Sequence, residues 1–106
     1  MCGICGIIGK VEQDSIERMC DAMVHRGPDS MGLHKDDRAQ LGMRRLKIID
    51  LAGSDQPISN ETGDLHLVCN GEIYNYGSLR TSLEERGHRF VTQGDVEVIL
   101  HLYEEY

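Results

Sequence analysis

Residues 2–9 are Cys2-Gly3-Ile4-Cys5-Gly6-Ile7-Ile8-Gly9, an apolar run with a glycine at every third position. Such a run predicts a buried strand, and its glycines let other backbone pack closely against it. A dinucleotide-binding loop would need paired first glycines followed by the start of a helix, and this spacing lacks both. We therefore expect a core strand here and no phosphate-binding turn.

Cys2 directly follows Met1, so removal of Met1 would place a thiol and an α-amine on one residue. The reference pKa of an α-amine is about 7.7 to 8.0 and that of a thiol is about 8.5, so the amine can accept the thiol proton near neutral pH. Terminal nucleophiles are activated by their own amine in this way. Taken alone, the more ordinary interpretation of Cys2 is a small apolar residue in a buried strand.

Length and charge limit the classes of protein. A chain of 106 residues forms one domain at most. Its 11 basic and 18 acidic residues give a formal charge of -7, which disfavours nucleic acid and anionic membrane as partners. The sequence has neither an apolar stretch of about 20 residues nor a secretory pattern, so we expect a cytoplasmic protein.

The four cysteines are better explained as reduced thiols than as a disulfide framework, because no secretory signal is present. A structural zinc site would want a second close pair beside Cys2 and Cys5, whereas Cys20 and Cys69 stand alone. A dithiol redox pair would lie between a strand and a helix, not inside an apolar run. We therefore predict no metal ligands in this chain.

The first half of the chain predicts a helix and a hairpin. The helix begins at Asp14, with Glu17 in a capping-box-like position, and its expected buried face consists of Ile16, Met19, Cys20, Met23 and Val24. Gly27 and Pro28 end it in a tight charged turn over residues 25–30. Strands over 31–34 and 39–49 then flank a polar tip at 35–38.

The second half predicts a loop over 50–64, a strand over 65–69, a helix from Asn75 to about Arg86 ended by Gly87, and a strand over 89–92. Leu79 and Leu83 are expected to face inward. A last helix from Asp95 has its expected apolar face at Val98, Ile99, Leu102, Tyr103 and Tyr106, where the pattern stops without a terminator and suggests a truncated domain. These elements predict a mixed α and β architecture with antiparallel strands.

Three further sites could serve a nucleophile that carries out acyl transfer. Asn70 and Gly71 follow a strand and could donate to an oxyanion, although Asn-Gly is more often a plain turn. Arg45 could bind a carboxylate in a bidentate way, although surface arginines are usually only solvated. Asp95 could accept from an ammonium group or could cap its own helix.

Five motifs stand together in a fixed order: Cys2-Gly3-Ile4-Cys5-Gly6-Ile7, His25-Arg26-Gly27-Pro28-Asp29-Ser30, Arg45-Leu46-Lys47-Ile48-Ile49-Asp50-Leu51 with Gln56-Pro57, Asn70-Gly71-Glu72-Ile73-Tyr74-Asn75, and Asp95-Val96-Glu97-Val98-Ile99. They closely resemble the N-terminal glutamine amidotransferase domain (class II, N-terminal-nucleophile hydrolase) of glutamine-hydrolysing asparagine synthetases. The resemblance covers nearly the whole chain. It favours this branch over the phosphoribosyl and glucosamine-phosphate amidotransferases, which share the Cys-Gly start.

The resemblance implies an α+β fold, the N-terminal part of an αββα sandwich with antiparallel sheets. It also implies L-glutamine as substrate and roles for individual residues. Cys2 would be the nucleophile, and Asn70 with the Gly71 N–H would form the oxyanion hole. The substrate would be bound by the remaining residues of the site: Arg45 at its carboxylate, Glu72 and Asp95 at its α-ammonium, and the backbone of Ile48 and Ile49 along the pocket. Residues 25–30 would be a structural or closing loop.

Lys47 and Gly94 stand where the family often carries a small hydroxyl residue, which changes the hydrogen bonding expected beside Arg45 and Asp95. Family members continue into further strands and a synthetase domain that uses ATP and Mg²⁺ to make asparagine from aspartate. We expect residues 1–106 to be the front of such a domain, unstable unless completed, with no cofactor of their own. A homodimer and a non-catalytic module of the same fold stay open as alternatives.

Overall fold

A computed structural model describes residues 2–9, 13–46 and 55–106 of the chain. The chain divides into two compact units, Met1–Asp50 and Leu51–Tyr106, and each is described by itself. Both contain helices and antiparallel strands, which confirms the expected α+β class.

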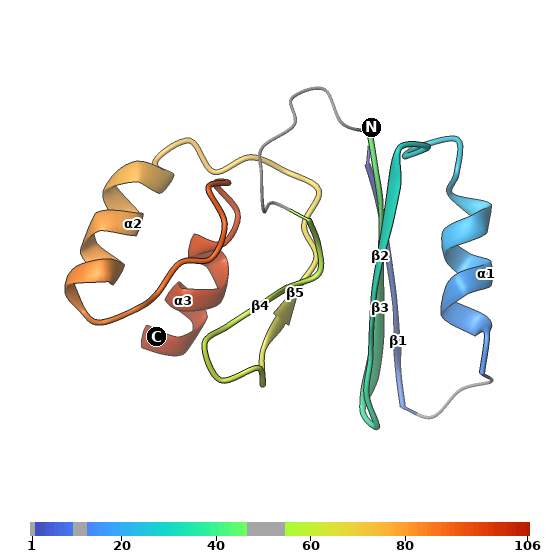
Figure 1. Ribbon diagram of the computed structural model, residues 1–106, viewed down its shortest axis with the longest axis horizontal. Helices are drawn as coiled ribbons and strands as arrows, with labels where there is room; N and C mark the ends of the chain where they lie inside the picture. Colours follow the sequence, from blue (N-terminus) through green and yellow to red (C-terminus); the bar gives the residue numbers. More distant parts are fainter. Residues whose placement is uncertain (1, 10–12, 47–54) are drawn as a thin grey trace. The chain divides into compact units, whose positions relative to one another are not determined.

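The first unit is built on a three-stranded antiparallel sheet with the strand order β1-β3-β2 (Figure 1). Its strands are β1 (Gly3–Ile8), β2 (Ser30–Lys35) and β3 (Ala39–Arg45). β2 and β3 form the expected hairpin, and Asp36 accepts hydrogen bonds from the backbone N–H groups of Arg38 and Ala39 in its tip. β3 ends at Arg45, and the predicted extension to residue 49 lies largely outside the described residues.

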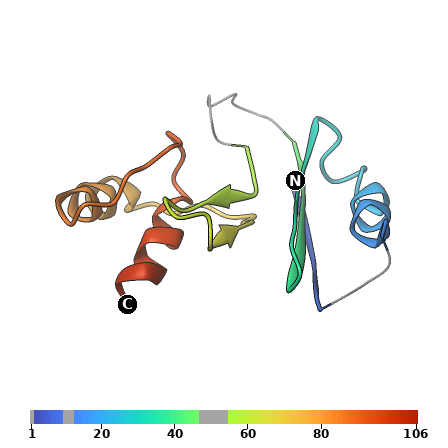
Figure 2. The ribbon, with the colours of Figure 1, turned by 60° about the horizontal axis from the view of Figure 1, so that its bottom comes forward.

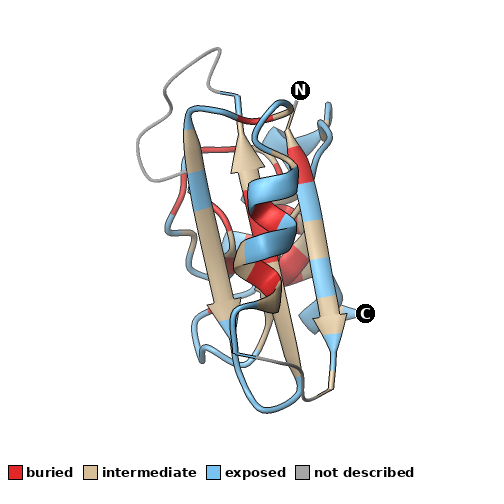
Figure 3. Cartoon of the chain, turned by 90° about the vertical axis from the view of Figure 1, so that its right-hand side faces the viewer, coloured by how far each residue is buried: buried red, intermediate tan, exposed pale blue. Residues whose placement is uncertain are grey.

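Helix α1 (Ser15–Ala22) covers one face of this sheet, as two views show (Figures 1 and 2). Ile16 and Cys20 are fully buried against the sheet, as predicted (Figure 3). Two details of the predicted helix are wrong. Met19, inside the helix, and Val24, beyond its end at Ala22, are both more than a third exposed. Glu17 makes an ion pair with Lys35 of β2 rather than a capping box.

The contact between helix and sheet is closest at Gly42 of β3. A Cβ atom there would lie 2.5 Å from Cys20 Sγ and 2.8 Å from Cys5 Sγ, so only glycine fits. The two sulfurs lie 3.6 Å apart, and all four cysteines are free thiols. Burial, with a contribution from the Cys5 contact, raises the pKa of the Cys20 thiol to about 12. Cys20 is therefore core, in agreement with its place in the helical pattern.

The second unit contains β4 (Ile58–Ser59), β5 (His66–Leu67), α2 (Tyr76–Glu85) and α3 (Val98–Glu105). β4 lies inside the segment predicted to be a loop and pairs antiparallel with β5, so that prediction is wrong at these two residues. β5 is shorter than the predicted strand over 65–69. Ile58, Val96 and Leu100 form the core of this unit, with partly buried apolar side chains around them.

Helix α2 has the predicted boundaries. It begins after Asn75, whose side chain makes no capping hydrogen bond, and it ends at Gly87, which has a φ of 95°. A positive φ is the left-handed conformation that glycine adopts readily at helix ends. Leu83 is buried as expected.

The predicted strand over 89–92 is wrong, because a buried carboxylate takes up its backbone donors. The N–H groups of Val91 and Thr92 donate to Glu97, and the carbonyl of Thr92 accepts from Arg80. Burial alone would raise the pKa of Glu97, but hydrogen bonds from His101, Thr92 and Val91 outweigh it and lower that pKa. An ionised side chain therefore organises this segment in place of a neighbouring strand.

The buried face of α3 also differs from the prediction. Val98, Leu100 and His101 are buried, whereas Tyr103 and Tyr106 are 73% and 89% exposed. Val98 is therefore the predicted position that is buried, and His101, which the apolar pattern does not include, lies on the buried face. Within the described residues, no helix is both long enough and apolar enough to span a membrane.

Candidate functional site

Cys2 and Arg45 lie on neighbouring strands of the first unit. Gly3 pairs with Arg44, so extending the β1–β3 register by one residue places Cys2 opposite Arg45. Gly3 and Cys5 face α1, since a Cβ at Gly3 would meet Met23 and the Cys5 sulfur meets Cys20. Side chains alternate along a strand, so Cys2 and Arg45 share the opposite face of the sheet. The predicted nucleophile and carboxylate ligand therefore belong to the same end of one sheet and to the same face.

The turn after α1 holds both of these strand ends. Arg26 Nε donates to the carbonyl of Cys2 at 3.2 Å, and Arg44 Nε donates to the carbonyl of Gly27 at 2.9 Å. Asp29 N donates to the carbonyl of Arg45 at 3.0 Å. One short segment is thus hydrogen-bonded to the residue that carries the thiol and to the residue that carries the guanidinium.

Gly27 makes the closest of these approaches. A Cβ atom built on Gly27 would lie 2.3 Å from the carbonyl carbon of Arg44 and 2.5 Å from the backbone nitrogen of Arg45. Both distances are far below van der Waals contact. Residues 25–30 therefore act as a structural loop, one of the two roles expected for them. Glycine at position 27 lets this loop pack directly against the backbone of β3.

Asn70 and Gly71 follow β5 in the second unit, and both are exposed. The buried Gln56 side chain accepts a hydrogen bond of 2.7 Å from the N–H of Cys69, which fixes the chain directly before Asn70. The backbone of Gly71 does not have a positive φ, and a Cβ there would lie in ordinary contact with Cys69 Sγ at 3.7 Å. The fold of this unit therefore gives no steric reason for glycine at position 71.

Glu72 and Asp95 line one cavity of about 280 Å³, together with Ile73, Tyr74, Tyr76, Gln93 and Gly94. Asp95 Oδ2 accepts a hydrogen bond of 2.6 Å from the N–H of Ile73. This bond ties the start of the α3 segment to the Asn-Gly-Glu-Ile loop. Asp95 precedes Glu97, which occupies the N-cap position of α3, so Asp95 does not cap that helix.

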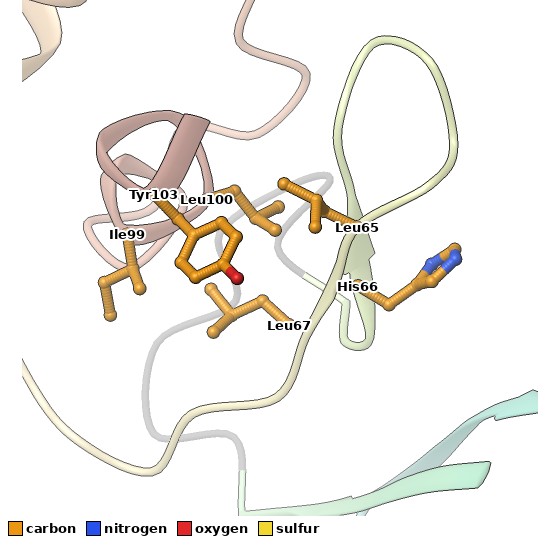
Figure 4. Close-up of a pocket in the computed structure, with 6 residues that line it drawn as sticks. All are labelled: Leu65, His66, Leu67, Ile99, Leu100 and Tyr103. Carbon is orange, nitrogen blue, oxygen red and sulfur yellow. The ribbon is translucent and has the colours of Figure 1, made fainter. Parts of the chain in front are cut away.

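The second unit has another cavity, of about 200 Å³, that is apolar (Figure 4). Leu65, Leu67, Ile99, Leu100 and Tyr103 line it, while the ring of His66 points away from these side chains. No carboxylate lines this cavity, so it offers no partner for an ammonium group. The cavity beside Glu72 and Asp95 is the better candidate for an amino acid.

Cys69 is a free thiol, but its surroundings make it a poor nucleophile. Burial first, and then the nearby charge of Asp95, raises the pKa of the Cys69 thiol. Since the thiolate is the reactive form, both Cys69 and Cys20 are disfavoured at neutral pH. The predicted nucleophile, Cys2, is half-buried at the strand end.

The structure thus brings the predicted residues together in two groups. Cys2 and Arg45 belong to the first unit, and Asn70, Gly71, Glu72 and Asp95 belong to the second. Ile48 and Ile49 lie outside the described residues. The sequence interpretation missed Arg26 and Gln56 as residues that hold the site. Arg26 and Gln56 both belong to motifs given in the sequence analysis, but only their hydrogen bonds in the folded chain show that they hold the site.

Each unit by itself provides some of the groups that acyl transfer from an amino acid to a thiol would need. The first unit offers a thiol and a guanidinium on one sheet face, and the second offers an amide donor, a backbone N–H and two carboxylates. Guanidinium and carboxylate groups are the usual partners of the two ends of a free amino acid. In the first unit, strand pairing sets the positions of Cys2 and Arg45. In the second unit, the hydrogen bond from the N–H of Ile73 to Asp95 connects the two segments that carry the carboxylates.

Comparison with known proteins agrees with this description. The family model described as "Glutamine amidotransferase domain" matches residues 1–106. Two relatives in Bacillus subtilis (strain 168), named asparagine synthetase [glutamine-hydrolyzing] 1 and 2, are 42% and 44% identical over 100% and 99% of this chain. A protein of Zea mays, named asparagine synthetase [glutamine-hydrolyzing], is 43% identical over 100% of it. The chain spans only 15–19% of the length of these relatives. Because the family model covers the whole chain, the chain belongs to the glutamine amidotransferase domain family.

Proposed function

We propose that this chain hydrolyses L-glutamine to glutamate and ammonia, with Cys2 as the nucleophile once Met1 has been removed. The Cys2 sulfur attacks the side-chain amide carbon, and its proton passes to the α-amine of the same residue. That amine then protonates the departing ammonia, which leaves a thioester. Water hydrolyses the thioester to glutamate and restores the thiol. The observation that carries the proposal is the placement of Cys2 opposite Arg45 in a chain of this family.

The substrate contacts follow the two groups of residues. Arg45 binds the α-carboxylate of glutamine, and Glu72 and Asp95 bind its α-ammonium. Asn70 and the N–H of Gly71 donate to the oxyanion that develops during attack. Support comes from the cavity that Glu72 and Asp95 share and from the absence of a packing reason for glycine at position 71. A residue without a side chain leaves its N–H open to the substrate. The backbone of Ile48 and Ile49 completes the pocket in this proposal.

The names of the relatives extend the proposal to a longer protein. We propose that residues 1–106 are the front of a glutamine amidotransferase domain that feeds ammonia to a fused synthetase domain. In this proposal the synthetase domain uses ATP and Mg²⁺ to make asparagine from aspartate, and the whole protein is cytoplasmic. The relatives are named as glutamine-hydrolysing asparagine synthetases, and the chain spans only a small part of each.

The direct test is labelling with a diazo-ketone analogue of glutamine followed by intact mass measurement and peptide mapping. We expect one adduct, on Cys2, in protein whose mass shows that Met1 has been lost. Excess glutamine should protect Cys2 from the label. The raised pKa values of Cys20 and Cys69 disfavour their reaction. Label on Cys5, Cys20 or Cys69 without label on Cys2 would contradict the mechanism and favour a non-catalytic module.

Replacing Glu72 with glutamine is expected to raise the KM for glutamine by about 10- to 100-fold, because a charge-assisted contact to the α-ammonium is lost. Glu72 is exposed, so folding should be unaffected. The measurement is steady-state release of glutamate at varied glutamine concentration.

The matched control is Glu85→Gln at the end of α2, which removes the same charge from another exposed position. It should leave KM within about twofold of the wild type, since surface substitutions away from a site have small effects. An equal rise in KM for both variants would show that net charge, and not a contact of Glu72, is responsible.

A further inference from the structure

Four side chains of the second unit converge at a point that the glutamine site does not use. They are Glu61 in the turn after β4, His88 after α2, and His101 and Glu104 one turn apart on α3. One ligand atom from each lies within 4.8 Å of the other three. Imidazole and carboxylate are donor groups that divalent transition metals accept.

Four nitrogen–oxygen distances in this cluster are close to those of a tetrahedral site. His101 Nδ1 lies 2.9 Å from Glu61 Oε1 and 3.2 Å from Glu104 Oε1. His88 Nδ1 lies 3.6 Å and 3.9 Å from the same two oxygens. Bond lengths of about 2.0 to 2.2 Å in a tetrahedron separate neighbouring ligand atoms by roughly 3.3 to 3.5 Å. The observed separations fall on both sides of this value, so small side-chain rotations would produce the geometry.

A second carboxylate orients each imidazole. His101 Nε2 lies 3.0 Å from Glu97 Oε2, and His88 Nε2 lies 2.7 Å from Glu105 Oε1. An ionised carboxylate can only accept, so each histidine keeps a proton on Nε2 and directs Nδ1 toward the cluster. A carboxylate behind a ligating histidine is the arrangement found in zinc proteins. This pairing, present on both histidines, is independent of the four-residue cluster itself.

The charges around the cluster also favour a bound cation. Glu61, Glu97, Glu104 and Glu105 surround the two imidazoles, and Arg86 pairs with Glu105 at 3.2 Å. Acceptor atoms that face one another in this way need a proton or a cation between them. One divalent cation can take that place for all four ligand atoms at once. The ring centroid of Phe90 lies 4.5 Å from that of His101, so an apolar ring packs beside the cluster.

We propose that Glu61, His88, His101 and Glu104 bind one divalent transition-metal cation of the Zn²⁺ class as a structural site. The cation joins three segments that are far apart in the sequence: the β4–β5 turn, the chain after α2, and α3. The site stands apart from the cavity lined by Glu72 and Asp95 and does not depend on glutamine hydrolysis.

The test is titration of metal-free protein with Zn²⁺ against a chromophoric chelator, with Co²⁺ as a spectroscopic probe. We expect one equivalent of Zn²⁺ and a tetrahedral Co²⁺ spectrum without thiolate charge transfer, since none of the four ligands is sulfur. At a free Zn²⁺ concentration of about 100 times Kd, the melting temperature should rise by about 10 °C.

Glu104→Gln and Glu61→Gln should each weaken Zn²⁺ binding by at least about 10-fold and reduce the rise in melting temperature. Glu61 and Glu104 are both exposed, so both variants should fold, which circular dichroism checks. The control, Glu85→Gln, should bind as the wild type does. Failure of the wild type to bind Zn²⁺, unchanged affinity in Glu104→Gln, or a Co²⁺ spectrum with thiolate bands would each overturn the proposal.

Discussion

Replacing Cys2 with alanine is expected to lower the rate of glutamine hydrolysis by at least about 10⁴-fold, because no other group can form the thioester. The nearest alternative thiol along the chain, Cys5, faces α1 and contacts Cys20 on the other side of the sheet. The measurement is glutamate release, with circular dichroism to show that the variant is folded. Glutamine binding should persist, because Arg45, Glu72 and Asp95 remain.

The control for this prediction is Cys5→Ala, which removes the second thiol of the same Cys-x-x-Cys motif. It should keep activity within about 10-fold of the wild type, because its side chain points away from the face that Cys2 shares with Arg45. Loss of activity in Cys5→Ala together with full activity in Cys2→Ala would overturn the assignment of the nucleophile.

The α-amine adds a second requirement that separates this mechanism from that of an ordinary cysteine enzyme. If Met1 stays attached, Cys2 keeps its thiol but its nitrogen becomes a peptide N–H, which cannot accept a proton. Protein with Met1 retained should therefore be as inactive as Cys2→Ala. The described contacts of Cys2, such as that of its carbonyl with Arg26, would be unaffected by this change.

The sequence predicted the elements whose causes are local. Gly87 ends α2 because a positive φ is needed there, and the polar tip before Ala39 forms the hairpin through Asp36. Ile16 and Cys20 are spaced by one helical turn and are both buried. Each of these features depends on residues within a few positions of one another, so composition and periodicity were sufficient.

The sequence failed where distant residues decide the structure. The segment at 89–92 has the composition of a strand, but Glu97 takes the N–H groups of Val91 and Thr92. His101 is fully buried, and its carboxylate partners come both from the α3 segment, at Glu97 and Glu104, and from the distant β4–β5 turn, at Glu61. The cluster of Glu61, His88, His101 and Glu104 could not be predicted either. Its members are scattered over the second half of the chain, and only the fold brings them together.

In the candidate site, the sequence predicted some features and missed others. Residue chemistry first pointed to Cys2, Arg45 and Asp95, whereas Glu72 was assigned through the family resemblance alone. The bond from Ile73 N to Asp95 was not predicted, because an aspartate before a helix suggests a cap. Nor could the sequence show that residues 26–29 are hydrogen-bonded to both strand ends that carry Cys2 and Arg45.

Gly27→Ala is expected to lower the free energy of unfolding by about 2 to 4 kcal/mol, since the added methyl group overlaps with backbone. Its Cβ would lie 2.3 Å from the carbonyl carbon of Arg44, and a strand backbone cannot rotate away as a side chain can. To relieve the overlap, the turn must separate from β3 and weaken the bond between Asp29 N and the Arg45 carbonyl. A shift of about 1 Å at Arg45 would reduce activity by up to about 100-fold. Urea denaturation and glutaminase assays measure the two effects.

The matched control is Gly77→Ala in α2, the same chemical change at a glycine whose Cβ would meet nothing within 4 Å. Alanine is the better helix former, so this variant should be stabilised by up to about 1 kcal/mol and keep its activity. Gly27 does not have a positive φ, so the expected cost at that position is steric and not conformational. If Gly27→Ala were as stable as Gly77→Ala, the turn would not be packed against β3 as described, and Arg45 would have to be positioned by other contacts.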